Sequence, residues 1–93
     1  MSDNIIYDQM TKLLPDDKIE AVWFGDWGDR PNKREIIRDT LAKLSAGYGV
    51  GYTARSIVQK LKLAYGFEPT KRGRKYLYWA NQYAISMARI YGR

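Results

Sequence analysis

The chain has 93 residues, with 16 Lys and Arg against 10 Asp and Glu, and it contains neither cysteine nor histidine. This length suits one small domain over residues 1–93, and 45% hydrophobic with 14% aromatic residues is typical of a globular chain rather than a disordered one. The missing side chains exclude disulfides, thiol nucleophiles, the usual zinc ligands and the commonest general base. We therefore expect no catalytic residue, no metal site and no cofactor.

Charge divides the chain into two parts. Residues 1–30 carry seven acidic side chains against three basic ones, whereas residues 31–93 carry thirteen Lys and Arg against three acidic side chains. The basic part suits a polyanion, and the acidic part suits either an intramolecular cover for the basic face or a second partner. No apolar run is long enough for a membrane span and no signal peptide is recognisable, so the expected location is the cytoplasm.

Two short helices are predicted first, over residues 3–14 and from Asp16 onward, because Pro15 separates them and acidic side chains favour a helix start. The next stretch places Trp23, Phe24 and Trp27 beside Asp26. One interpretation is an exposed acidic and aromatic patch that binds a protein partner. The other, which we favour, is that the rings fill the core while neighbouring glycines turn the chain.

Two further helices are predicted in the middle of the chain. The first runs from about residue 32 to 46. Its outer face carries basic side chains that could touch a nucleic-acid backbone but that we expect to be simply solvated: Lys33, Arg34, Arg38 and Lys43. Glycine then alternates with Tyr and Val over residues 47–52, which we interpret as an extended connector that can pair as a minor strand at 48–52. Thr53 is predicted to cap the next helix, which continues to about Ala64. Its outward-facing cations are Arg55, Lys60 and Lys62.

The most informative stretch is the start of the last helix, predicted over residues 70–91. Thr70 suits the N-cap position, and Pro69 marks the boundary. The helix then opens with four cations in five residues, although a helix start carries partial positive charge and favours acidic side chains. These cations are Lys71, Arg72, Arg74 and Lys75. We interpret the cluster as a phosphate site formed by the cations together with outward-pointing backbone amides.

Periodicity gives the last helix two faces. The polar face continues from the cations through Tyr78, Asn81 and Gln82, which have the chemistry to contact bases; an ordinary solvated face is the alternative. The apolar face repeats at spacings of 4, 3, 4 and 3 residues and is either a homodimer seam or a surface that covers other helices of the same chain. It consists of Tyr76, Ala80, Tyr83, Met87 and Ile90.

The elements predict an all-α domain of about five helices. The order of helix, short extended piece, helix, turn and helix over residues 32–85, with residues 53–61 in the middle helix, resembles helix-turn-helix domains of the winged or small phage-regulator kind. The resemblance implies that the last helix is a recognition helix that enters the major groove by its N-terminal half. This chain departs from the pattern in having Lys62 where a turn glycine is usual, a longer turn from Ala64 to Pro69, and no wing hairpin after the last helix.

These features favour a nucleic-acid-binding module, in the first place a small DNA-binding regulator of transcription. Four cations of the last helix are expected to hold phosphates, its next polar residues to reach bases, and the cations of the preceding helix to add backbone contacts. An RNA-binding version stays open because Tyr-rich surfaces stack unpaired bases. The alternative from another class is a small phage or mobile-element protein that binds a host protein through Trp23, Phe24, Asp26 and Trp27. An enzyme is not expected.

Overall fold

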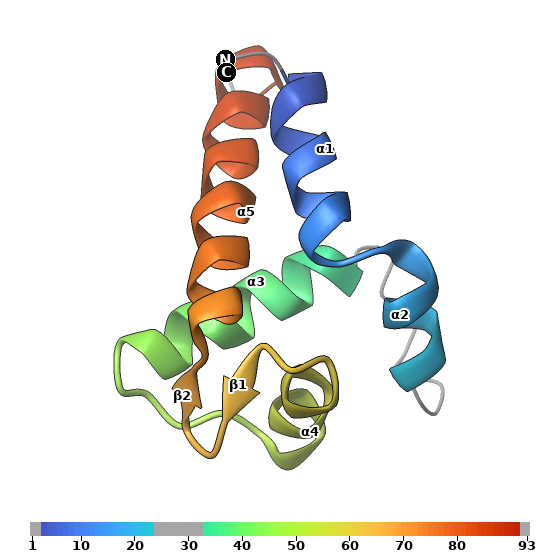
Figure 1. Ribbon diagram of the computed structural model, residues 1–93. Coiled ribbons are helices and arrows are strands. Elements are labelled where there is room, and N and C mark those ends of the chain that lie inside the picture. Colours follow the sequence, from blue (N-terminus) through green and yellow to red (C-terminus); the bar gives the residue numbers. More distant parts are fainter. Residues whose placement is uncertain (1–2, 24–32, 92–93) are drawn as a thin grey trace.

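The structure, a computed structural model, describes residues 3–23 and 33–91. Its described part has five helices and one short antiparallel hairpin, which confirms the mainly all-α prediction (Figure 1). The elements in chain order are α1 (Asp3–Leu13), α2 (Asp16–Val22), α3 (Lys33–Ser45), α4 (Tyr52–Lys60), β1 (Ala64–Tyr65), β2 (Glu68–Pro69) and α5 (Lys71–Tyr91).

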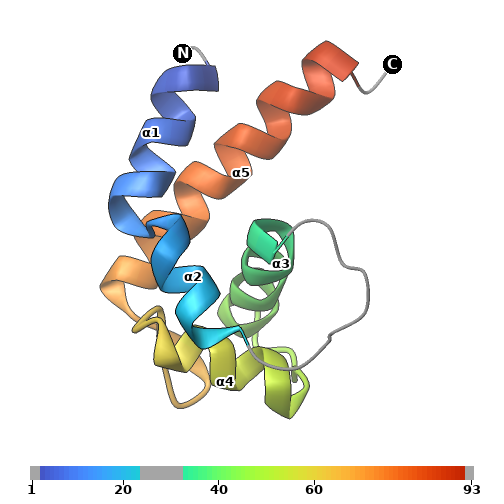
Figure 2. The ribbon, with the colours of Figure 1, turned by 90° about the vertical axis from the view of Figure 1, so that its right-hand side faces the viewer.

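The longest helix, α5, organises the others. It runs antiparallel to α1, so that the start of α5 lies beside the end of α1, and it crosses α3 (Figure 1). Figure 2 shows that α1 and α5 diverge toward the chain ends. The opposite end of the molecule is formed by α4 and the hairpin, with Ala64 paired to Pro69 and Tyr65 to Glu68. Because α3 contacts α4, α5 and β2, it joins the two ends.

The core lies where α1, α3, α4 and α5 meet, and it takes up the apolar face of α5. Tyr76 is the largest fully buried side chain, and Ala80 is 3% exposed. Further along α5, the ring of Tyr83 lies 5.6 Å from that of Tyr7 in α1. The helices of the same chain therefore cover the first three positions of the predicted homodimer seam. Met87 is only partly buried, and the side chain of Ile90 lies outside the described residues.

Two expectations for the middle of the chain were wrong. The fourth helix begins at Tyr52, with Gly51 rather than Thr53 as its N-cap, and it ends at Lys60 rather than near Ala64. Residues 48–51 form no strand, and the strands of the described part lie instead in β1 and β2, where the prediction placed a helix end and a turn. The helix stops early because the backbone of Lys62 turns into the left-handed region, with φ of 65°.

A Schellman motif is formed around Lys62. The Lys62 N–H donates to the Gln59 carbonyl at 3.0 Å, and the Leu63 N–H donates to the Val58 carbonyl at 2.9 Å. The same motif ends α3, where Gly47, with φ of 85°, takes the equivalent position. A side chain in the left-handed region is strained and glycine is not, so Lys62 holds a position that glycine fills better.

Replacement of Lys62 by glycine is therefore expected to stabilise the fold. Lys62→Gly relieves the left-handed strain and raises the free energy of unfolding by about 1 kcal/mol, measured by urea denaturation. The reciprocal change Gly47→Lys, at the end of α3, is expected to lower it by a similar amount. Equal stability of Lys62→Gly and the wild type would contradict the assignment of strain to this residue.

The start of α5 is fastened to the segment that follows α4. The Thr70 hydroxyl accepts a hydrogen bond from the Gly73 N–H at 3.1 Å, which confirms Thr70 as the N-cap. The same residue donates its N–H to the Leu63 carbonyl and its hydroxyl to the Lys62 carbonyl, both at 2.9 Å. Gly73 is buried, and a Cβ atom placed on it would lie 1.9 Å from the Leu63 carbonyl oxygen. Only glycine permits this contact.

Gly73→Ala is expected to displace the hairpin from α5. The added Cβ meets backbone rather than a flexible side chain, so we expect a loss of at least about 3 kcal/mol of unfolding free energy, or failure to fold. The matched control is Gly49→Ala, because a Cβ at Gly49 meets nothing within 4 Å. Circular dichroism during thermal unfolding measures both variants, and equal melting temperatures would show that the close contact is absent.

Candidate nucleic-acid interface

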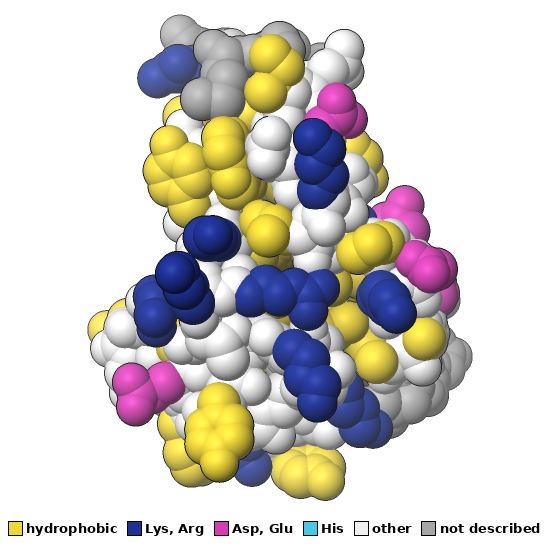
Figure 3. Space-filling model, viewed as in Figure 1, with side chains coloured by type: hydrophobic (Ala, Val, Ile, Leu, Met, Phe, Trp, Pro, Cys, Tyr) yellow, Lys and Arg dark blue, Asp and Glu magenta, His cyan; other side chains and the backbone are white. Residues whose placement is uncertain are grey.

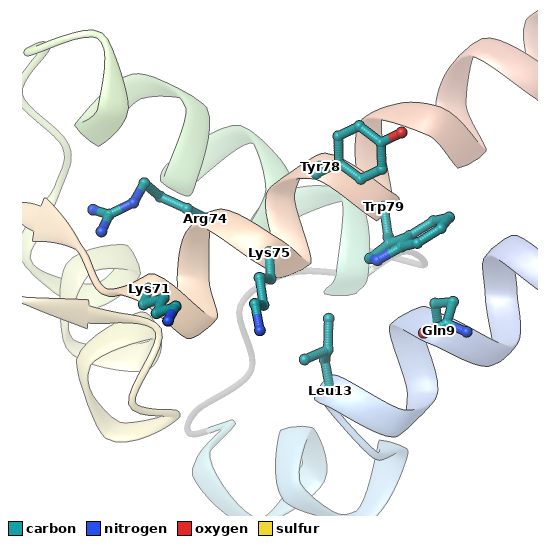
Figure 4. Close-up of a pocket in the computed structure, with 7 residues that line it drawn as sticks. All are labelled: Gln9, Leu13, Lys71, Arg74, Lys75, Tyr78 and Trp79. Carbon is teal, nitrogen blue, oxygen red and sulfur yellow. The ribbon is translucent and has the colours of Figure 1, made fainter.

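Cations and aromatic rings come together at the start of α5, beside the end of α1. They line an open groove of about 630 Å³, which we call the basic–aromatic groove (Figure 4). Figure 3 shows Lys and Arg side chains gathered across this part of the surface, between α1 above and the hairpin below. The lining residues are Gln9, Leu13, Lys71, Arg74, Lys75, Tyr78 and Trp79.

Helical spacing explains why these side chains meet. Lys71, Lys75 and Tyr78 follow one another at four and three residues and so lie on one face of α5. The antiparallel course of α1 adds Leu13 from its last turn, and Figure 4 shows Leu13 and Lys75 pointing toward each other across the groove. The ring of Trp79 leans over α1 and makes an edge-on contact with Tyr78, with 5.1 Å between the ring centroids.

Three cations of the groove are available to a ligand. Lys71, Arg74 and Lys75 are exposed, and none of them forms an ion pair within residues 3–23 and 33–91. Arg74 donates one hydrogen bond, from Nη1 to the Pro69 carbonyl at 2.9 Å. The positive end of the α5 dipole adds to the potential of the three side chains. The groove is therefore electropositive, with apolar ring surface beside the charge.

Arg72 differs from its neighbours, because it holds the fold together. Its guanidinium donates from Nε and Nη2 to the Leu13 carbonyl at 3.0 and 2.5 Å, and from Nη1 to the Leu61 carbonyl at 3.0 Å. Leu13 ends α1 and Leu61 is the C-cap of α4, so the cation lies at the negative ends of two helices. These carbonyls take up three of its five N–H donors, so Arg72, which is partly buried, is less available to a phosphate than its exposed neighbours.

One backbone amide of the expected phosphate site is already bonded within the fold. The Gly73 N–H is taken by the Thr70 hydroxyl, and the Leu63 carbonyl lies against the first turn of α5. The Gly73 amide is therefore not available to an anion, whereas the exposed cations of the basic–aromatic groove are.

Within residues 3–23, no acidic side chain forms an ion pair with the cations of this groove. Asp16 pairs with Arg34 at 2.7 Å and Glu20 pairs with Lys33 at 2.8 Å, so two of the described acidic side chains lie against the start of α3 instead. The expectation that Arg34 faces solvent was wrong, because it also donates to the Leu14 carbonyl at 2.7 Å and to the Tyr76 hydroxyl at 3.1 Å. Burial raises the pKa of Tyr76 above its ordinary value of 10, and the nearby guanidinium opposes that shift.

Of the other predicted contact residues, only Tyr78 lines the groove, and the rest lie outside its lining. Tyr78 is 51% exposed and lines the groove, and the next turn of α5 carries Asn81, exposed, and Gln82, partly buried. The predicted contacts on the preceding helix lie elsewhere: Arg55 stacks on the Phe67 ring, and Lys62 lines a separate hollow between α4 and the hairpin. Lys60 is exposed in the last turn of α4.

Sequence reasoning missed three lining residues. Gln9 and Leu13 come from α1, and no local pattern links them to a helix that begins nearly sixty residues later. Trp79 falls between the polar and apolar faces of α5, so periodicity assigns it to neither. The sequence feature that could have indicated aromatic surface here is Tyr78, an aromatic residue on the polar face.

The residues of the alternative protein-binding patch are only partly described. Trp23 is partly buried against the core, and the Lys33 ammonium lies 5.5 Å from its ring centroid. This placement agrees with a core role for Trp23. Phe24, Asp26 and Trp27 lie outside the described residues.

Comparison with protein-family models, with curated proteins and with solved structures finds no match to this chain. Within residues 3–23 and 33–91, no helix combines the length and apolar character needed to cross a membrane. In place of the turn of a helix-turn-helix domain, the chain has the hairpin of β1 and β2 between α4 and α5.

The distinct role of Arg72 is testable by comparison with its neighbour. Arg72→Met leaves the Leu13 and Leu61 carbonyls without their donor, and we expect the free energy of unfolding to fall by about 2–4 kcal/mol. Lys71→Met removes the same charge from an exposed position and is expected to change it by no more than about 0.5 kcal/mol. Urea denaturation followed by tryptophan fluorescence measures both. Equal effects would mean that Arg72 is a surface cation.

Proposed function

We propose that this protein binds nucleic acid, in the first place DNA, through the basic–aromatic groove at the start of α5. The observation that supports the proposal is the placement of Lys71, Arg74 and Lys75. All three are exposed, have no ion pair in the described part of the chain, and lie where the helix dipole disfavours cations. A polyanion removes this unfavourable electrostatic energy, and counterion release adds to the affinity.

The three cations have different roles in this proposal. Lys71 and Lys75 are one turn apart and offer rotatable ammonium groups to successive phosphates. Arg74 is fixed by its bond to Pro69 and presents the rest of a planar guanidinium, which matches two phosphate oxygens. Further along the same face, Tyr78 and Asn81 offer a ring and an amide to the bases. A regulatory role for such binding, as the helix-turn-helix resemblance implies, stays a prediction.

Salt dependence tests the proposal. With three phosphates neutralised, a plot of log K against log salt concentration is expected to have a slope of roughly −2 to −3, measured by fluorescence anisotropy with labelled DNA. The double variant Lys71→Gln and Lys75→Gln is expected to weaken binding to all sequences alike and to reduce the slope by about 1 to 2.

The matched control is Arg89→Gln, which removes one exposed cation from the last turn of α5, far from the groove. It is expected to leave the slope nearly unchanged. Binding that is insensitive to salt, or a control that lowers affinity as much as the double variant, would count against the groove. Absence of binding to any DNA or RNA at low salt would rule out the proposed function.

A further inference from the structure

Three large aromatic side chains are exposed together at the end of the molecule formed by α4 and the hairpin. Tyr52 is 74% exposed, Tyr65 86% and Phe67 66%. Figure 3 shows hydrophobic side chains on this lower end of the surface. We call Tyr52, Tyr65 and Phe67, together with Arg55, the aromatic end. Rings of this size are usually buried or at a binding surface, and neither the fold nor the basic–aromatic groove accounts for them.

The aromatic end is held in a defined arrangement. The Gln59 side chain of α4 donates from Nε2 to the Gly66 carbonyl at 2.8 Å, which fixes the tip of the hairpin against the helix. The guanidinium of Arg55 lies 4.6 Å from the Phe67 ring centroid and 5.8 Å from that of Tyr52. The Phe67 ring and the backbone of the hairpin tip that carries Tyr65 thus start from a defined position, which reduces the entropy lost when a flat group binds.

Charge favours a polyanion as the occupant. Residues 48–75, which include the aromatic end, carry seven Lys and Arg against one acidic side chain, Glu68. That carboxylate is exposed on β2, opposite Tyr65, and is the single anionic group of this segment. A protein partner must therefore be strongly acidic, whereas a nucleic acid brings phosphates for the cations and flat rings for the aromatic side chains.

We propose that the aromatic end binds the bases of an unpaired nucleic-acid strand by stacking on Tyr65 and Phe67. The inference rests on the proposed function for the class of ligand, and it adds that the strand is single. Base faces are open to a flat side chain in an unpaired strand, whereas a duplex hides them and shows only base edges in its grooves. Rings that project from a hairpin tip suit an unpaired strand and not a duplex.

A second hollow has residues next to both surfaces. A hollow of about 340 Å³ lies between α4 and the hairpin and is lined by Lys62, Tyr65 and Thr70, among others. Thr70 directly precedes Lys71, which lines the basic–aromatic groove. A strand whose phosphates lie on Lys71 and Lys75 therefore passes Lys62 on its way to the rings of the hairpin. Lys62 places a cation on this path, although glycine would fit its left-handed backbone with less strain.

The test replaces the rings by an aliphatic side chain. Tyr65→Leu with Phe67→Leu keeps apolar surface at two exposed positions but removes the stacking faces, and thermal unfolding checks that the fold is intact. Labelled oligothymidylate is expected to bind at least tenfold more weakly, since each lost base stack costs roughly 5- to 150-fold in affinity. A duplex and an abasic deoxyribose-phosphate strand, which offer charge without open bases, are expected to bind the variant and the wild type equally.

The possible outcomes separate this inference from the proposed function. Undiminished binding of oligothymidylate to the leucine variant overturns the stacking role, while the groove keeps its proposed function if Lys71→Gln with Lys75→Gln still weakens binding. Tighter binding of duplex than of single strand by the wild type also overturns the inference and leaves nucleic-acid binding in place. Equal loss of duplex, abasic and single-strand binding in the leucine variant would point to damage of the hairpin and overturn it as well.

Discussion

The position of one guanidinium determines how the helices of this protein meet. Arg72, in the first turn of α5, hydrogen-bonds the last carbonyl of α1 and the C-cap carbonyl of α4. Those helix ends carry partial negative charge, so the bonds are charge-assisted at both sites. Arg34 holds the next carbonyl of the α1 end from the side of α3, and also the hydroxyl of the buried Tyr76. Two arginines thus fix the end of α1 against α3 and α5, and the basic–aromatic groove lies beside that junction.

The same junction explains why the remaining cations of α5 are unusual. The unfavourable electrostatic energy of Arg72 at a helix start is offset by its hydrogen bonds to the carboxyl ends of two other helices. Lys71, Arg74 and Lys75 have neither such bonds to two helix ends nor an ion pair in the described part of the chain. Lys62 is a second case, since it keeps a charged side chain in a left-handed conformation that glycine adopts without strain. Local preferences that a chain violates without gain to its fold are most readily explained by function.

Much of α5 was predictable, because its signals are local. Thr70 as cap, Pro69 as boundary and the repeat of apolar residues through Tyr76 and Ala80 all follow from spacing along the chain. The different role of Arg72 was not predictable, because it carries the same charge as its neighbours and differs only in what α1 and α4 place beside it. The end of α4 was also missed, since residues 61–64 continue an apolar pattern and the turn depends on the backbone of Lys62.

The hairpin shows how the two proposed binding surfaces depend on a single support. On one side, the Leu63 carbonyl and Thr70 fix the start of α5, at the point where Gly73 leaves room for them. On the other side, the tip is tied to Gln59 of α4 and presents Tyr65 and Phe67. The groove itself is lined by α1 and α5, beside this support. If both proposals hold, a strand held by its phosphates at the groove would meet the rings at a raised effective concentration. Weak contacts at each of the two proposed surfaces would then combine into appreciable affinity for a flexible polyanion.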